Sequence, residues 1–522
     1  MNLRTISILS TITLASGLAV AGCGGGSSGG GGAVGAGSTT TPGSTTPPTS
    51  TASITSLRLA GGAIVTGDAS IAVRVAEPSG APQDVALAYS TDNGQTWAVP
   101  TLSPGPLLAV ASGPAPGAEH LVTWKTGTDI PRVASVLLRA TIVGAAPVVA
   151  GPFVIDNVAA SSLVLSRKPY IQAVAGTTAM VIWRTDTDTD TVLEYGETAA
   201  LGLTAGDPAA RTKLHEVTLT GLTPGAKYTY RVVSSGLRVT DRQTFGAAPP
   251  SSQGDFRFLA FGDSGTGSAE QMKVAALLSA EQADVAIHMG DIIYPFGALG
   301  NPIGEYDDKF FKPYEGFLSR MPIYPVIGNH DLIALLGGPY KDTFYLPDNG
   351  NALAKELYFS FEWGDAKFIA LETTGLFLVP LGEHMRWLQR EISSNTRKWL
   401  IVYMHVPLYS CGNHGDSSIL QNVLGPMFEN GRVDLVLTGH DHDYERTKPI
   451  KQFNRDPAYP GLVHVLTGGG GAGTYGINPN SRTAVAVRTN HYMRFHAHGD
   501  DLDGEAVDLN GAVIDSFTIK NQ

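Results

Sequence analysis

The sequence has few cysteines, few charged residues and no excess of basic ones. Its 522 residues include only 2 cysteines, too few for a disulfide framework or a cysteine-rich zinc site, so a metal site must use His, Asp, Asn or Tyr. Charged residues make up 16%, and 36 Lys and Arg stand against 47 Asp and Glu, which argues against a nucleic-acid binder with a broad basic surface. The 43% hydrophobic fraction excludes chain-wide disorder, while 62 Gly and 32 Pro favour a β-rich architecture.

The N-terminus has the pattern of an export signal. Arg4 precedes an apolar stretch over residues 6–20 that is too short and too mild for a membrane-spanning helix. Small residues then precede Cys23, which resembles a bacterial lipoprotein signal and implies cleavage of residues 1–22 and a lipid anchor on Cys23; an ordinary secretory signal is the alternative. The resemblance implies an exported lipoprotein of the cell envelope. Gly24, in place of the Asp associated with inner-membrane retention, favours the outer membrane.

Composition and periodicity divide the rest of the chain into four segments. Residues 23–53 are almost entirely Gly, Ala, Ser, Thr and Pro, which predicts a low-complexity linker. Residues 54–157 alternate with period two and contain an Asn-Gly turn, which predicts a β-sandwich accessory domain, more consistent with a spacer than with carbohydrate adhesion. Residues 163–247 have a second β-pattern, similar to a fibronectin type III sandwich. From residue 254 to 522, apolar strands alternate with helical stretches, which predicts a layered α/β domain.

Metal-capable side chains follow five of the apolar runs in this last segment. Ligand sites in open α/β sheets lie beyond the carboxyl ends of the strands, so five separate loops are predicted to deliver these side chains to one edge. Each residue alone is an ordinary cap or turn former, and their shared position is what indicates a site. The candidate metal ligands are Asp263, Asp291, Tyr294, Asn329, His405, His440 and His442.

The five blocks resemble the calcineurin-like metallophosphoesterase superfamily, and Tyr294, three residues after Asp291, resembles the purple acid phosphatases within it. The resemblance implies a multidomain protein in which two β-sandwich domains precede a four-layer α/β domain, a β-sandwich flanked by helices. It also implies two metals bridged by Asp291. Asp263, Asp291, Tyr294 and His442 are implied to hold iron(III), and Asp291, Asn329, His405 and His440 a divalent zinc, iron or manganese. The residue types agree, because a phenolate favours a trivalent ion.

The implied reaction is hydrolysis of phosphate monoesters by attack of a metal-activated hydroxide. His330 and His414 are the candidates for substrate-facing catalytic residues, one of which protonates the leaving group. Hydrolysis of phosphodiesters, including cyclic nucleotides, is the alternative for the same site, and a surface adhesion protein with a degenerate third domain is the alternative of another class. A nucleophilic pair of Cys411 and His414 is a further rival. The oligomeric state and the physiological ester stay open.

Several residues beside these blocks are predicted to have structural roles. Residues 468–471 are four glycines without the Lys of a nucleotide phosphate loop, which predicts a flexible loop at the rim. Asp441 and Asp443 alternate with the metal histidines and are predicted to point away from the metals. Residues 247–252 have the composition of an interdomain linker.

Overall fold

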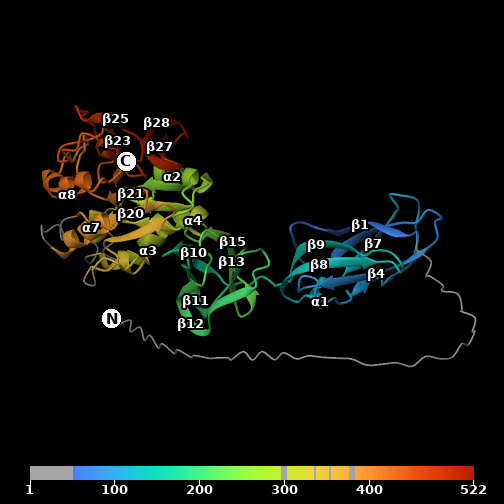
Figure 1. The fold of residues 1–522 in the computed structure, drawn as a ribbon. Helices are drawn as coiled ribbons and strands as arrows, with labels where there is room; N and C mark the ends of the chain where they lie inside the picture. Colours follow the sequence, from blue (N-terminus) through green and yellow to red (C-terminus); the bar gives the residue numbers. More distant parts are fainter. Residues whose placement is uncertain (1–50, 295–301, 334–336, 352–353, 375–381, 522) are drawn as a thin grey trace, which may run out of the picture. The chain divides into compact units, whose positions relative to one another are not determined.

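A computed structural model describes residues 51–294, 302–333, 337–351, 354–374 and 382–521. The predicted signal segment, Cys23 and nearly all of the predicted linker lie outside these residues. Within the described ranges, no helix combines the length and the apolar character needed to cross a membrane. The chain is multidomain and rich in β-strands (Figure 1), which confirms the predicted fold class.

The first sandwich consists of two sheets that face each other across a core of their own. One sheet has the strand order β1 (Ser53–Ala60), β3 (Ala69–Ala76), β7 (Ala118–Trp124) and β5 (Leu102–Ser103). The other has the order β2 (Ile64–Val65), β9 (Val148–Asp156), β8 (Val133–Thr141), β4 (Gln83–Ser90) and β6 (Leu107–Val110), with the short helix α1 (Thr126–Asp129) at one end. Alternate residues such as Ile71, Val73 and Val136 are fully buried between the sheets. The period-two pattern therefore places one face of each strand in the core.

The second β-unit forms a six-stranded sheet. Its strands are β10 (Leu165–Gln172), β11 (Thr178–Gly196), β12 (Leu203–Thr220), β13 (Lys227–Ser234), β14 (Leu237–Arg238) and β15 (Gln243–Gly246). Its buried residues join those of the following domain in one continuous cluster, unlike the core of the first sandwich. The Gln172 side chain crosses this boundary, donating to the Ile323 carbonyl at 2.8 Å and accepting from the Tyr345 amide at 2.7 Å.

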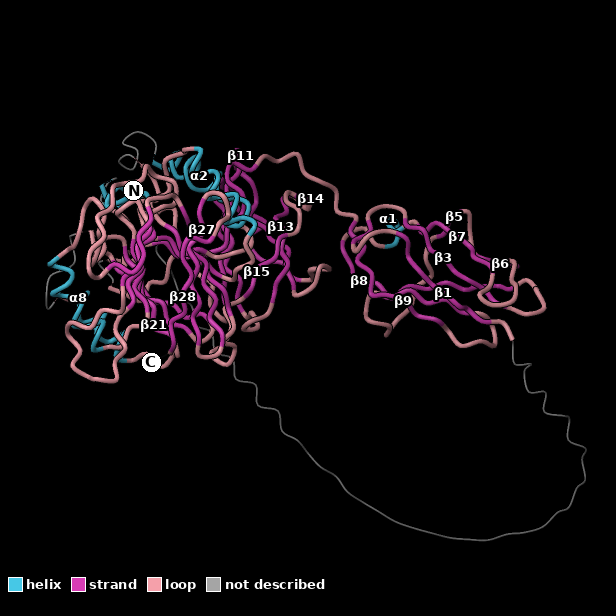
Figure 2. The backbone as a smooth tube through the Cα atoms, turned by 90° about the horizontal axis from the view of Figure 1, so that it is seen from above, coloured by secondary structure: helices cyan, strands magenta, loops and turns pink. Residues whose placement is uncertain are grey.

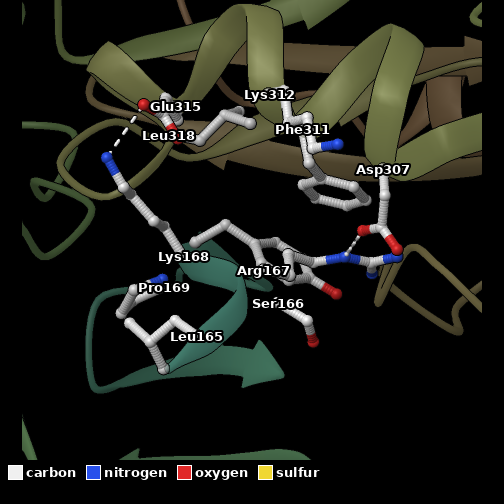
Figure 3. Close-up of a pocket in the computed structure, with 11 residues that line it drawn as sticks. Leu165, Ser166, Arg167, Lys168, Pro169, Asp307, Phe311, Lys312, Glu315 and Leu318 are labelled. Atoms are coloured by element: carbon white, nitrogen blue, oxygen red, sulfur yellow. Dashed lines mark hydrogen bonds and ion pairs between the residues drawn. The ribbon is translucent and has the colours of Figure 1, made fainter. Parts of the chain in front are cut away.

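Charged side chains hold the same boundary at its edge (Figure 3). Arg167 of β10 is buried, pairs with Asp307 at 2.5 Å and lies 3.8 Å from the Phe311 ring centroid. The partners belong to a run of α3 (Pro302–Tyr306), the π-helical turn η1 (Asp307–Phe311) and α4 (Lys312–Leu318). A guanidinium that both ion-pairs and stacks on an aromatic ring fixes the sheet against these helices.

The last domain contains two sheets with helices on the outside. One sheet has the order β18 (Ile323–Pro325), β17 (Val285–His288), β16 (Phe256–Phe261), β26 (His491–His498), β27 (Asp501–Asp508) and β28 (Val513–Lys520). The other has the order β19 (Phe359–Trp363), β20 (Ala366–Leu371), β21 (Trp399–Met404), β22 (Leu435–Thr438), β24 (Val463–Thr467), β23 (Tyr444–Thr447) and β25 (Thr483–Val487). Phe258 and Phe368 meet between the sheets with ring centroids 5.3 Å apart.

Helices cover the outer faces of this pair of sheets. They include α2 (Ala269–Ala280), α7 (Glu383–Ser393) and α8 (Ser418–Asn430), while the short helices α5 (Asn329–Ile333) and α6 (Gly338–Lys341) follow β18 in the chain. Figures 1 and 2 both show strands between α2 and α8. Strands β16, β17 and β18 run parallel, as do β20, β21, β22 and β24, so the loops at their carboxyl ends share one edge.

Candidate metal centre

The seven predicted ligands all lie beyond the carboxyl ends of parallel strands, Asn329 as the first residue of α5 and the others in loops. Asp263 follows β16, Asp291 and Tyr294 follow β17, and Asn329 follows β18 in the first sheet. His405 directly follows β21, and His440 and His442 follow β22 in the second sheet. The site therefore lies where the two sheets meet at one edge.

Two groups of donor atoms converge on the Asp291 carboxylate. In the first group, the Tyr294 hydroxyl oxygen lies 3.0 Å from Asp291 Oδ2, 3.2 Å from Asp263 Oδ1 and 3.1 Å from His442 Nε2. Metal–ligand bonds of about 2.0–2.2 Å place neighbouring ligand atoms about 2.9–3.5 Å apart. These separations therefore fit one ion.

The second group approaches the same oxygen of this carboxylate. His405 Nε2 is 3.4 Å from Asp291 Oδ2, 2.9 Å from Asn329 Oδ1 and 3.2 Å from His440 Nδ1. The nitrogen and oxygen donors suit a borderline divalent ion. The structure thus brings together all seven residues that the sequence singled out, and Asp291 Oδ2 is close to both groups.

The backbone at these residues is unusual. Asp263, Asp291 and His440 have φ values of 58°, 52° and 73°, in the left-handed region that non-glycine residues seldom adopt. Glycines directly before ligand residues allow the loops to approach one another closely. A Cβ on Gly439, which precedes His440, would lie 2.3 Å from Asp263 Oδ2. A Cβ on Gly328 would lie 2.1 Å from Asp291 Oδ1. Such strain is typical of functional sites.

Backbone carbonyls orient two of the histidines. His405 Nδ1 lies 2.8 Å from the Met289 carbonyl oxygen, and His442 Nδ1 lies 2.8 Å from that of Gly473. A neutral ring that donates from Nδ1 presents a lone pair on Nε2, the atom that faces the carboxylates. Lone pairs from imidazoles, carboxylates and an amide then point at the same spaces, which fits cations there.

The protein groups alone shift the pKa values of the ligand side chains, and these shifts show which protonation states a bound cation has to change. Burial by itself lowers the pKa of His405, but the Asp291 carboxylate outweighs it and raises this pKa to about 10. Burial, together with the charge of His405, lowers the pKa of His440 to about 3. Burial and the two neighbouring carboxylates raise the pKa of Tyr294 well above its usual range. The Tyr294 hydroxyl therefore needs a strong Lewis acid, such as a trivalent ion, to lose its proton and bind as a phenolate.

His330 and His414 lie at the two ends of this site. The His330 amide donates to Asp291 Oδ1 at 2.9 Å, and its ring centroid is 4.4 Å from that of Tyr294. The His414 ring centroid is 4.1 Å from that of His440. Their side chains are 22% and 41% exposed, so both reach solvent, unlike the buried side chains of Asp263, Asp291 and His405.

Asp441 and Tyr475 also belong to the site, although no site role was predicted for either. Asp441 points away from the metal donors, as predicted, but its carboxylate accepts from the His414 backbone amide at 2.9 Å and lies 2.8 Å from His414 Nδ1. The Tyr475 ring stacks on His442 with centroids 4.0 Å apart. The sequence places Asp441 between the two metal histidines His440 and His442, which is a signal for a nearby role, whereas nothing in the local pattern indicates Tyr475.

The prediction of a flexible loop at residues 468–471 is wrong. All four glycines are buried, and the Gly470 amide donates to the Gly262 carbonyl at 2.8 Å. A Cβ on Gly468 would lie 2.0 Å from the Asp441 carbonyl oxygen. The glycines allow this backbone to pack directly against the loops that carry Asp263 and Asp441.

The environment of Cys411 argues against a cysteine nucleophile. The thiol is buried, and burial together with the neighbouring Glu445 raises its pKa to about 12. A nucleophilic cysteine needs an electropositive setting that lowers its pKa. The Cys411–His414 alternative is therefore not supported.

Residues 256–444 match the protein family described as calcineurin-like phosphoesterase. Acid phosphatase type 7 of Homo sapiens is 28% identical over 344 residues, 56% of this chain and 76% of the relative. Purple acid phosphatase 21 of Arabidopsis thaliana is 26% identical over 287 residues, 51% of this chain and 62% of the relative.

A solved structure shares the fold. It is a purple acid phosphatase from yellow lupin (Lupinus luteus) seeds, with a TM-score of 0.59 and 19% identity, and the match covers 87% of this chain and 93% of the lupin chain. The family match, the relatives and the convergence of donor atoms confirm the resemblance seen in the sequence. Residues 256–444 therefore form a calcineurin-like metallophosphoesterase domain, and purple acid phosphatases are among the homologues of the chain.

Proposed function

We propose that this metal-dependent phosphatase hydrolyses phosphate monoesters at a binuclear metal centre. The observation that carries the proposal is the convergence of seven donor side chains from five chain segments around the Asp291 carboxylate. Homology to acid phosphatases and purple acid phosphatases supports the reaction class.

The proposed ligand sets follow the two groups of donor atoms. Asp263, Asp291, Tyr294 and His442 hold iron(III), and Asp291, Asn329, His405 and His440 hold a divalent zinc, iron or manganese. When bound, two such ions act as Lewis acids that bind the phosphoryl group and lower the pKa of water. Two carboxylates and one phenolate leave the ion pair with net positive charge, so the local field attracts a phosphate although the chain is acidic overall.

The two partly exposed histidines are proposed to act on the substrate. His330 stands beside Tyr294 and the Asp291 carboxylate, where it can donate to a phosphoryl oxygen. His414 pairs through Nδ1 with Asp441 and presents Nε2 on the opposite side of its ring. That arrangement suits a general acid, which gives its proton to the departing ester oxygen.

The proposal is tested with a panel of phosphate monoesters and diesters together with metal analysis of the purified protein. We expect two metal ions per chain and a preference for monoesters. A preference for diesters would favour the phosphodiesterase alternative, and a protein that takes up no metal would favour a binding module.

A pair of variants tests the bridging carboxylate. Even the outer partners of metal ligands cost about 10–100-fold when mutated, so Asp291→Asn is expected to lower turnover by more than about 100-fold. Asp284 is the matched control, because it directly precedes the other end of β17 and its carboxylate accepts from the Arg257 amide at 2.8 Å. Full turnover by Asp291→Asn would contradict the bridge.

We also propose that the protein is exported and anchored by lipid at Cys23. The support is the signal-like segment over residues 1–22 and the linker that follows it. Cells fed labelled palmitate should label the wild type but not Cys23→Ser, and labelled protein should fractionate with the outer membrane. Equal labelling of both proteins would refute the anchor.

A further inference from the structure

A second group of metal-capable side chains lies between the loop that carries His414 and strand β23. One ligand atom each of Cys411, Asp443 and Glu445 lies within 4.8 Å of the other two. The three residues are buried, with exposed fractions of 5%, 0% and 2%. We propose that this group is a separate cation site that takes Zn²⁺, distinct from the phosphatase centre.

The strongest indication is the state of Asp443. Both of its carboxylate oxygens are buried, and neither has a hydrogen-bond partner among the described residues. Two nearby arginines are engaged elsewhere: Arg446 of β23 pairs with Asp515, and Arg482, just before β25, pairs with Asp416. Removing a carboxylate from water without a partner is costly, so buried carboxylates are normally paired or bound to a metal. A cation between Asp443 and Glu445 satisfies both.

The fold fixes the other two side chains toward the same space. Side chains alternate along β23, so Arg446 reaches Asp515 on one face while Glu445 lies on the opposite face. There Glu445 Oε2 accepts from the Cys411 backbone amide at 2.6 Å. The loop of Cys411 is thereby held against the strand with the thiol beside the carboxylates. The site is built from two chain segments, and its ligands are positioned by backbone contacts.

The donor set selects the kind of ion. A thiolate with two carboxylates suits Zn²⁺, which binds sulfur at about 2.3 Å and oxygen at about 2.0–2.2 Å. Magnesium and calcium prefer oxygen ligands alone. Binding converts the Cys411 thiol to a thiolate and releases its proton to solvent. The bound ion ties the loop that carries His414 to β23, the strand that begins just after His442.

Cobalt substitution tests the site with a signal that the phosphatase centre cannot give. The proposed ligands of that centre are nitrogen and oxygen atoms, whereas Co²⁺ bound to a thiolate has a charge-transfer band in the near ultraviolet. The full-length chain is used with Cys23→Ser, which leaves Cys411 as the sole cysteine. We expect the band in this protein and its loss in the added variants Cys411→Ser and Asp443→Asn. Metal analysis should show the loss of one ion per chain.

Asp291→Asn separates the two sites. It is expected to reduce metal at the phosphatase centre while the thiolate band stays. Absence of the band in the Cys23→Ser protein, with metal content unchanged by Cys411→Ser, would overturn the proposal and show that the carboxylates are protonated instead. A band that disappears in Asp291→Asn would also overturn it, because the thiolate would then depend on the phosphatase centre. Circular dichroism confirms that each variant is folded.

Discussion

The pairing of Asp441 with His414 yields the sharpest prediction about the mechanism. Asp441 is fully buried and its carboxylate lies 2.8 Å from His414 Nδ1, with further bonds from the His414 amide at 2.9 Å and the Ser410 hydroxyl at 2.6 Å. Burial by itself raises the pKa of Asp441, but these hydrogen bonds and the charge of His414 outweigh it and lower the pKa. Asp441 is therefore ionised at neutral pH and positions the His414 ring.

Asp441→Asn removes the charge and keeps the shape. The amide oxygen still accepts from His414 and the amide nitrogen turns toward Ser410, so the loop should stay in place. Hydrogen bonds to charged groups contribute about 1.5–3 kcal/mol, which corresponds to about a 10- to 150-fold fall in kcat/KM if the interaction serves the transition state. Metal content should not change, because Asp441 does not face the metal donors.

The assay compares two substrates with different leaving groups. A 4-nitrophenolate departs without a proton, whereas an alkoxide needs one, so the loss should be concentrated on alkyl phosphates if His414 is the general acid. Asp416→Asn is the control, because Asp416 lies in the same loop and pairs with Arg482 at 2.6 Å. In a His414→Ala background, Asp441→Asn should cost nothing more. Equal losses on both substrates, or additive effects of the two mutations, would refute the role of the pair.

Three other predictions test separate features. Tyr294→Phe should abolish the phenolate-to-iron charge-transfer colour of the purified protein, whereas a colourless but active wild type would point to two divalent ions. Tyr475→Ala should weaken metal retention about two- to tenfold by removing the stacking on His442, while Tyr475→Phe should not; equal retention by both would refute the role of stacking. Burial raises the pKa of Asp434 to about 7 from 3.8, so the folded state keeps this proton to higher pH and loses stability as pH rises from about 4 to 7. Urea unfolding should therefore show that Asp434→Asn, which can still accept from the Leu400 amide, is stabilising at pH 8 but not at pH 4; the same change at both would contradict this linkage.

The strands and the loops that carry Asp263, Asp291 and His405 could be predicted from the sequence because their signals are local. A continuous apolar run indicates a buried strand, and the parallel arrangement then places every loop at one edge. The ligand positions follow from this rule and do not depend on the details of side-chain packing.

Features that depend on distant segments could not be predicted in the same way. Residues 468–471 have the composition of a flexible loop, and only the approach of the backbone at Gly262 and Asp441 shows why glycine is needed. Residues 247–252 look like a linker, yet Ala247 and Ala248 are buried and belong to the core that joins the two domains. Local composition reports conformational freedom in the unfolded chain, whereas the fold decides which glycines and alanines are packed.

The arrangement of the ligand loops indicates that the site is organised by the protein before any metal binds. The Asp263 amide donates to the Gly290 carbonyl at 3.0 Å, and the His440 amide donates to Asp263 Oδ2 at 3.0 Å, so the loops hold one another. Asp331 accepts from the Ile292 amide at 3.1 Å and from the Gly328 amide at 3.0 Å, which ties the Asp291 loop to the Asn329 loop. Strained residues cost about 1–3 kcal/mol each and persist only where surrounding contacts over-determine them. Since these contacts are between protein groups, the strain at Asp263, Asp291 and His440 is borne by the fold and does not require a bound ion.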